Sequence, residues 1–297
     1  MKILFTIILT IWYSALTQAN NVPVTSSEYK LMLKPELFSR VNESVQVDKF
    51  LHVLKMEIET ATNRTIDGVM SLKKDRLVTF YDVPQICKLK NRRYSFRARV
   101  DSDGDSEVTL KFRSLDRAKS SAADVSSEKK ADTKLEADIG VVEGNDFKVV
   151  YSHSNSISSK RNINKMKDIN VLFPGFRKEC DLDDELPLVR VGGLSVQEHV
   201  YKGATIDLGD IDAKISLTLW YDKTSSNSQT PVVAEVSFNY KKDFSTYNKK
   251  VVKRAKYSFI AMQNLTKWTA PNSKTKTSFI YDFDKNFCAP KQPKTKC

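Results

Sequence analysis

Basic side chains alternate with apolar ones along two consecutive segments of this chain. Arg97 and Arg99 lie between apolar residues in the segment 94–100, and Lys111 and Arg113 do so in the segment 108–113. This alternation is typical of strands with two different faces, and the Asp- and Gly-rich run between the segments predicts a hairpin. The two basic rows would then lie side by side, where they repel each other unless water or an anion such as a polyphosphate compensates them. A solvated sheet face is the alternative interpretation.

The same region carries four sequence elements in a fixed order. The segments FYDVPQICKLKNRRYSFRARV (residues 80–100) and VTLKFRS (residues 108–114) contain a Tyr-Asp-x-Pro turn, a short Leu-bearing helix, an Arg-x-Arg strand and a strand with a Leu-Lys pair. This order resembles the CYTH, or triphosphate tunnel metalloenzyme, superfamily. The chain is interpreted as a divergent, secreted member.

The resemblance implies a phosphate-binding set and a metal-binding set. In this superfamily the bore of a tunnel-like barrel is lined with basic residues that bind triphosphate, and carboxylates hold Mg²⁺ or Mn²⁺. The residues implied for phosphate are Lys30, Arg97, Arg99, Lys111, Arg113 and Arg190, and those implied for metal are Glu28, Glu136, Asp138 and Glu235. Ser26 and Ser237 stand where the superfamily has further glutamates, and no catalytic residue is predicted.

The pattern of the whole chain predicts one mainly β domain of the α+β class over residues 26–290. We expect an antiparallel tunnel-like β-barrel with a few peripheral helices, because two-faced strands follow one another through short turns. The expected strands are 27–33, 66–70, 77–81, 94–100, 108–113, 134–140, 147–153, 188–191, 204–208, 213–221 and 232–240, with a basic turn at 73–76. The expected helices are 48–61, capped by Asp48, 162–173, stopped by Pro174-Gly175, and 249–262.

Two segments depart from this pattern. Residues 114–133 are rich in Ser, Ala, Asp and Lys, which predicts a mobile loop or a short exposed helix that proteases would cut first. Residues 291–297 form a basic tail with no pattern.

The N-terminus and the cysteines indicate the secretory route. Residues 1–19 have the features of a signal peptide, and Asn42, Asn63 and Asn264 begin glycosylation sequons. The four cysteines show no metal-ligand spacing, so disulfides are expected, with three possible pairings. Cys288 with Cys297 would close a short loop and leave Cys87 for Cys180, but the sequence does not decide this.

Charge and hydropathy narrow the range of partners. The formal net charge is +12, or +11 without Lys2 of the signal peptide. Nucleic acid is ranked low as a partner, because no helix-turn-helix, zinc-finger or RNP-like motif accompanies the basic residues. No later stretch is apolar enough to span a membrane. The three histidines are isolated in the sequence, so no catalytic triad is predicted.

Two functions from different classes fit these observations. The first is a secreted, metal-dependent triphosphatase that binds triphosphate or polyphosphate in a basic tunnel. The second is a non-catalytic module for polyanions, or a structural module, that has lost part of its metal site. The serines at positions 26 and 237 favour the second function.

Overall fold

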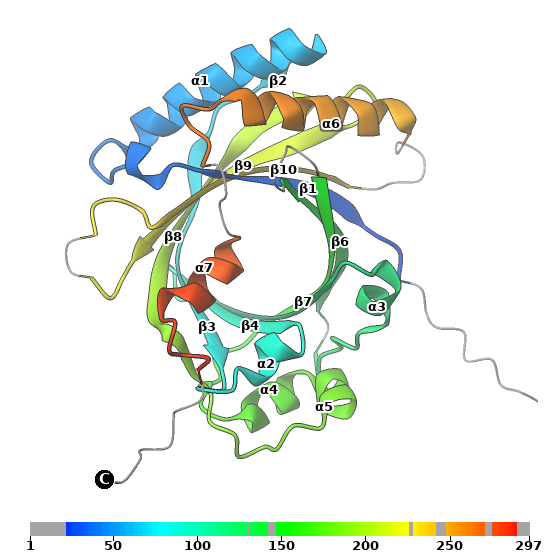
Figure 1. Ribbon diagram of the computed structural model, residues 1–297, viewed down its shortest axis with the longest axis vertical. Coiled ribbons are helices and arrows are strands. Elements are labelled where there is room, and N and C mark those ends of the chain that lie inside the picture. Colours follow the sequence, from blue (N-terminus) through cyan, green and yellow to red (C-terminus); the bar gives the residue numbers. More distant parts are fainter. Residues whose placement is uncertain are drawn as a thin grey trace, which may run out of the picture.

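A closed ring of strands forms the centre of the protein, as the computed structural model shows (Figure 1). The structure describes residues 22–129, 131–141, 147–225, 228–241, 248–270 and 275–289. Its strands are β1 (Ser26–Leu33), β2 (Ile66–Asp67), β3 (Ser71–Asp82), β4 (Tyr94–Asp101), β5 (Ser106–Ser114), β6 (Asp132–Val141), β7 (Phe147–Ser158), β8 (Val189–Asp207), β9 (Asp212–Asp222) and β10 (Val233–Lys241). Nine of them follow one another as β8-β3-β4-β5-β7-β6-β1-β10-β9, and β9 pairs with β8 to close the barrel. The predicted barrel is therefore confirmed.

One pair of barrel strands runs in the same direction. β1 and β6 are parallel, whereas the other neighbouring pairs are antiparallel. In the parallel pair, Ser26 lies opposite Glu136 and Glu28 lies opposite Asp138. The sequence predicted an antiparallel barrel, and this single parallel pair is what brings two acidic strands together.

The barrel has a polar interior and an apolar exterior. In β1 the burial alternates strictly, with Tyr29, Leu31 and Leu33 buried and Glu28 and Lys30 partly accessible. Since side chains repeat every second residue, the buried row faces the helices outside and the charged row faces the bore.

Helices cover the apolar exterior on two sides. The helices are α1 (Glu43–Thr62), α2 (Lys88–Asn91), α3 (Arg117–Ala122), α4 (Met166–Leu172), α5 (Pro174–Cys180), α6 (Lys249–Asn264) and α7 (Lys276–Phe283), with a 3-10 turn at Pro35–Leu37. α1 and α6 lie together along one side, and α2, α4 and α5 lie along the opposite side (Figure 1). α1 buries Val47, Phe50, Leu54 and Ile58 against the sheet, each contributing about 1.5–3 kcal/mol.

A buried carboxylate fixes the start of α1. The sequence predicted a start near Asp48, but the helix begins at Glu43, which is 6% exposed. The Glu43 carboxylate accepts hydrogen bonds from His199 Nδ1 at 2.8 Å and from the hydroxyls of Tyr201 and Tyr221. These partners lie on β8 and β9, so tertiary contacts extend the helix by one turn beyond its local signal.

Several strands differ in length from the prediction: β7 continues to Ser158, and the strand expected over 66–70 is reduced to β2. The expected basic turn at 73–76 lies inside β3, because Lys74 pairs with Asp101 and Arg76 pairs with Glu198 on neighbouring strands. The expected strands 188–191 and 204–208 belong to one strand, β8. Gly203 permits this continuity, since its φ is +133° and a Cβ there would lie 2.2 Å from the Val69 carbonyl oxygen.

The helical predictions also need correction. The helix expected over 162–173 is α4, which is shorter, and Pro174 begins α5 as well as ending α4. The segment 114–133 contains α3, a short helix as in one of the two predicted alternatives, and the start of β6. It is less exposed than expected, since Ser120, Ser121 and Val125 are buried. The predicted basic helix near the C-terminus is confirmed as α6, whereas α7 had no predicted counterpart. No helix in the described ranges has the length and apolar character needed to cross a membrane.

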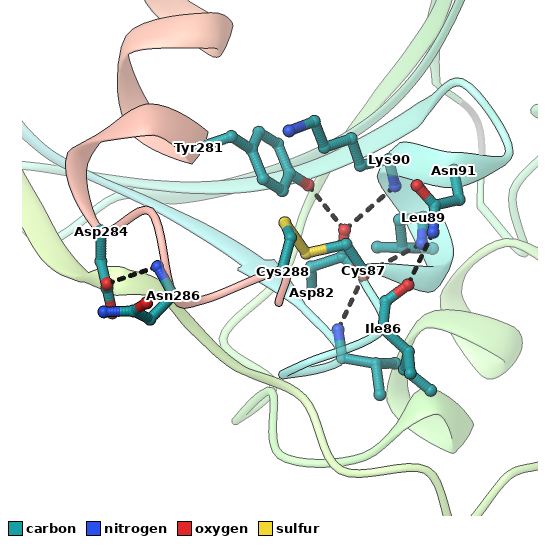
Figure 2. The surroundings of a disulfide bond; sticks show 11 residues. Asp82, Ile86, Cys87, Leu89, Lys90, Asn91, Tyr281, Asp284, Asn286 and Cys288 are labelled. Atoms are coloured by element: carbon teal, nitrogen blue, oxygen red, sulfur yellow. Dashed lines mark hydrogen bonds between the residues drawn. A yellow bond between two sulfur atoms is a disulfide. The ribbon is translucent and has the colours of Figure 1, made fainter. Parts of the chain in front are cut away.

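A disulfide joins Cys87, between β3 and α2, to Cys288, after α7 (Figure 2). Cys87 is therefore not paired with Cys180, which is a free thiol. The sequence left three pairings open, and the structure selects one that links residues 201 positions apart. Cys297, the tail 291–297 and the predicted signal peptide 1–19 lie outside the described residues.

Replacing Cys288 with serine should lower the free energy of unfolding by about 2–5 kcal/mol, because the unfolded chain regains the freedom of a long loop. Urea unfolding followed by tryptophan fluorescence without reductant would measure this. Cys180→Ser, which removes the free thiol, is the matched control and should have a much smaller effect. A dithiol reduces the disulfide and should therefore lower the urea midpoint of the native protein. If the midpoint did not change, the prediction would be contradicted.

Candidate functional site

The bore of the barrel contains a charged cavity of about 1080 Å³. Basic residues outnumber acidic ones by eleven to seven among its described lining residues. The predicted hairpin forms its basic wall, with Arg97 opposite Thr109 and Arg99 opposite Glu107. The side-by-side basic rows expected from the sequence therefore face the interior of the barrel and not bulk solvent.

Three carboxylates from adjacent strands meet in this cavity. Glu28 of β1 and Glu136 and Asp138 of β6 each have a carboxylate oxygen within 4.8 Å of the others, and we call these residues the acid trio. The Lys30 ammonium lies 2.9 Å from both a Glu28 and an Asp138 oxygen. Ser152 donates a hydrogen bond to the other Asp138 oxygen. The parallel pairing of β1 and β6 creates this concentration of negative charge.

Ion pairing holds Glu28, Asp138 and Lys30 in their charged forms. Burial alone would raise the pKa of Asp138, but Lys30, Lys111 and Arg113 outweigh it and lower that pKa. The pKa of Glu28 is lowered in the same way, against burial, chiefly by Lys30. Burial opposes the charge of Lys30, yet Asp138 and Glu28 raise its pKa. These groups therefore remain ionised over the physiological pH range.

The basic wall is less well compensated. Burial lowers the pKa of Lys111 to about 8, although Lys111 lies 3.4 Å from a Glu136 oxygen. Burial, followed by the charge of Arg99, lowers the pKa of Arg97. The Nε of Arg97 is buried without a hydrogen-bond partner in the described structure, and its Nη2 reaches Thr109 only at 3.4 Å. An anion in the cavity would supply the missing partner.

Nine further charged residues among those described line the cavity without having been predicted, and two of them, Arg76 and Glu198, form an ion pair. Arg76 contacts Glu198 on the adjacent strand, and Trp220 donates its indole N–H to Glu198 at 3.0 Å. Arg99 and Arg76 lower the pKa of Glu198 despite its burial. Arg76 alternates with Val78 and Phe80, a signal that was hidden by the turn predicted over 73–76.

The remaining predicted residues lie apart from the acid trio. Arg190 is exposed near the start of β8, opposite Tyr81, and does not line the cavity, so its predicted place in the bore is wrong. Glu235 is 5% exposed and lines the cavity, but it is not a member of the trio. Its carboxylate is ion-paired at 2.7 Å with Lys276 of α7. The structure thus brings together nine of the ten predicted residues in one cavity.

The donor set of the acid trio fits a hard divalent cation. Its ligand atoms are all carboxylate oxygens, which Mg²⁺ and Mn²⁺ prefer, and no thiol or imidazole accompanies them. Ser26 donates a hydrogen bond to Glu136 at 3.2 Å and so orients a member of the trio.

No protein-family model and no curated protein sequence matches this chain. Solved structures with some similarity include a Hippeastrum protein named as an adenylyl cyclase and described as having a dominant triphosphatase activity. It shares 13% identity, covers 87% of this chain and 96% of its own, and has a TM-score of 0.44. Two proteins named as adenylate cyclases, from Vibrio parahaemolyticus and Bacillus halodurans, share 10% and 11% identity with TM-scores of 0.37 and 0.39. They cover 87% and 85% of this chain and 98% and 95% of their own.

Proposed function

We propose that this protein binds the phosphate groups of a triphosphate or polyphosphate inside its barrel and hydrolyses them with the help of Mg²⁺ or Mn²⁺. The observation that carries the proposal is the convergence of Lys111, Arg113 and the under-compensated Arg97 on one cavity with the acid trio. A buried guanidinium without a partner costs free energy, and a phosphate oxygen is a strong acceptor for it.

Each group has a distinct role in this proposal. Arg97, Arg99, Lys111 and Arg113 bind phosphate oxygens, and Lys30 joins this basic set to the acid trio. Glu28, Glu136 and Asp138 would hold the divalent cation, which when bound neutralises phosphate charge and orients water for attack on phosphorus. Positioning and charge stabilisation supply most of the catalysis in phosphoryl transfer, so no protein nucleophile is required.

The second candidate is a non-catalytic polyanion-binding module. Ser26 and Ser237 provide neutral hydroxyls where two more carboxylates would strengthen metal binding. A protein that keeps the basic wall and holds metal weakly would bind phosphate chains without hydrolysing them.

We also propose that the protein is secreted and glycosylated. The predicted signal peptide, the exposed side chains of Asn42, Asn63 and Asn264 and the disulfide support this. The three asparagines lie at the ends of α1 and α6.

A phosphate-release assay separates the two candidates. Inorganic tripolyphosphate, nucleoside triphosphates and long-chain polyphosphate would be tested with Mg²⁺, Mn²⁺ or a chelator. Hydrolysis that requires metal and is lost in Asp138→Asn supports the enzyme. Tight tripolyphosphate binding without release under any of these conditions supports the binding module, and neither binding nor release would refute both.

Arg97→Ala and Lys111→Ala should each weaken tripolyphosphate binding by about 1.5–3 kcal/mol, the scale of hydrogen bonds to charged groups. Isothermal titration calorimetry measures the change. The matched control is Arg190→Ala, which removes a predicted phosphate ligand that lies outside the cavity and should leave affinity unchanged. Equal affinities in all three variants and the native protein would place the binding site elsewhere.

Tripolyphosphate affinity should fall as the pH rises above about 8, where Lys111 loses its proton in the free protein. Above that pH, binding must first restore the proton to Lys111. This lowers the affinity by up to about tenfold per pH unit, until the pH reaches the pKa of Lys111 in the complex. Titrations from pH 7 to 9.5 would measure the slope. Lys111→Arg keeps the charge without titrating in this range, so its slope should be smaller.

The stability contribution of Lys111 has the opposite sign. Its pKa is lowered from 10.5 on folding, so between about pH 8 and 10.5 the unfolded chain binds more protons and this contribution to stability rises with pH. Loss of affinity in this window therefore does not reflect unfolding caused by Lys111. If tripolyphosphate affinity depended on pH equally in the native protein and in Lys111→Arg, Lys111 would not be the group whose titration weakens binding.

A further inference from the structure

Helix α7 occupies one end of the barrel bore. In Figure 1 it lies within the outline of the ring, whereas α1, α4 and α6 lie outside. Ile280 and Tyr281 are buried in a cluster with Phe80 and Val196 of the barrel wall and Trp220 of β9. The first residues of α7, including Lys276, line the charged cavity. The helix thus has an apolar part that fills the bore and a polar start that faces the site.

Two tethers fix α7 in this position. The Tyr281 hydroxyl donates a hydrogen bond to Asp82 at 2.8 Å, and the Cys87–Cys288 disulfide follows the helix (Figure 2). Asp82 also accepts hydrogen bonds from the backbone N–H groups of Leu89 and Lys90, which orient its carboxylate. The position of Lys276 in the cavity is therefore constrained from both the barrel wall and the end of α7.

Lys276 brings a positive charge to Glu235. The Lys276 ammonium lies 2.7 Å from a Glu235 oxygen, and it also lies 5.7 Å from the centre of the Trp220 ring. The Glu235 side chain is only 6% exposed, so its negative charge requires a cation nearby. Lys276 supplies that cation from within the chain.

Glu235 and the acid trio belong to different levels of the tunnel. Across the β1–β10 pair, Glu28 lies opposite Asn239, whereas Glu235 lies opposite Met32. Four residues of extended strand separate the backbones at these two levels by about 13 Å, although the charge of Glu235 still acts on Lys30 and that of Lys276 acts on Glu28. Metal–oxygen bonds are about 2.0–2.6 Å long, and Glu235 is not among the carboxylates whose oxygens lie within 4.8 Å of one another. In this arrangement an ion held by the acid trio would not also be bound by Glu235.

Building on the proposed function, we propose that Lys276 is a specificity-determining residue that replaces a second divalent cation. Its ammonium occupies the cation position at Glu235, and the cavity takes one metal ion at the acid trio. A phosphate chain that spans the two levels would meet a metal ion at one end and a fixed ammonium at the other. The substrate class is therefore a phosphate chain that carries one divalent cation, with its other end free of metal.

Calorimetric titration with Mn²⁺ alone tests the proposal without relying on activity. The native protein should bind about one ion, and Lys276→Gln should bind about two, because the freed Glu235 carboxylate gains a metal in place of its ammonium. Lys276→Arg keeps the positive charge and should still bind one. Lys276→Gln combined with Glu235→Gln should return to one, and circular dichroism would verify that each variant is folded.

Several outcomes would overturn the inference. One ion in folded Lys276→Gln, or two in the native protein, would show that Lys276 does not exclude a metal. Loss of the single native ion in Glu235→Gln would make Glu235 a ligand of that ion, and this variant remains informative if Lys276→Gln does not fold. No Mn²⁺ binding by the native protein, or binding unaffected by Asp138→Asn, would instead refute the metal site of the proposed function.

Discussion

The contact of Lys30 with Glu28 and Asp138 is the interaction on which the charged bore depends. Three carboxylates within a few ångströms repel one another strongly, and a lysine placed between two of them makes the group compatible with folding. Lys30 is also the point at which the acid trio meets the basic wall, since Asp138 interacts electrostatically with Lys111 and Arg113 as well. Removing one partner would leave the remaining charges buried and unbalanced, at a cost of several kcal/mol. The same charges that constrain folding therefore define the ligand the cavity can accept.

A polar interior changes how this barrel acquires its stability. The inward faces of its strands cannot form an apolar core, so the outward faces must, and water is kept from them by α1 and α6 on one side and by α2, α4 and α5 on the other. Tyr29 shows the arrangement: it alternates with Glu28 and Lys30 in the sequence, but stacks on Phe238 and meets Phe259 of α6 edge-on. The hydrophobic effect thus acts on the outside of the sheet, which leaves the bore free for charged groups.

Local periodicity explains which features could be predicted from the sequence. The hairpin of β4 and β5 and the acidic pair on β6 follow from a two-residue period, whereas Glu28, Lys30 and Glu235 were chosen from the family resemblance. All nine of these predicted residues line one cavity. Arg190 fails because alternation indicates the face of a strand but not which residues lie deep in the bore. Lys276 was missed, and the Cys87–Cys288 pairing was left undecided, because both depend on contacts between distant segments. Arg76 was missed because its charge is balanced by Glu198, which lies 122 residues away in the sequence. Without knowledge of that partner, the basic run that contains Arg76 resembles an exposed turn.

The end of the bore that holds α7 differs chemically from the end that holds the acid trio. There the inner wall includes apolar residues such as Val78 and Trp220, which would be hydrated in an open tunnel. An eight-residue helix is too short to be stable alone, so packing against that wall must stabilise α7, and the disulfide limits how far it can move away. The combination makes the bore asymmetric: an apolar end closed by a tethered helix, and a charged part in which Lys30, the trio and the basic wall face one another. A ligand bound there would be aligned by the order of charges along the tunnel, from the trio to Lys276.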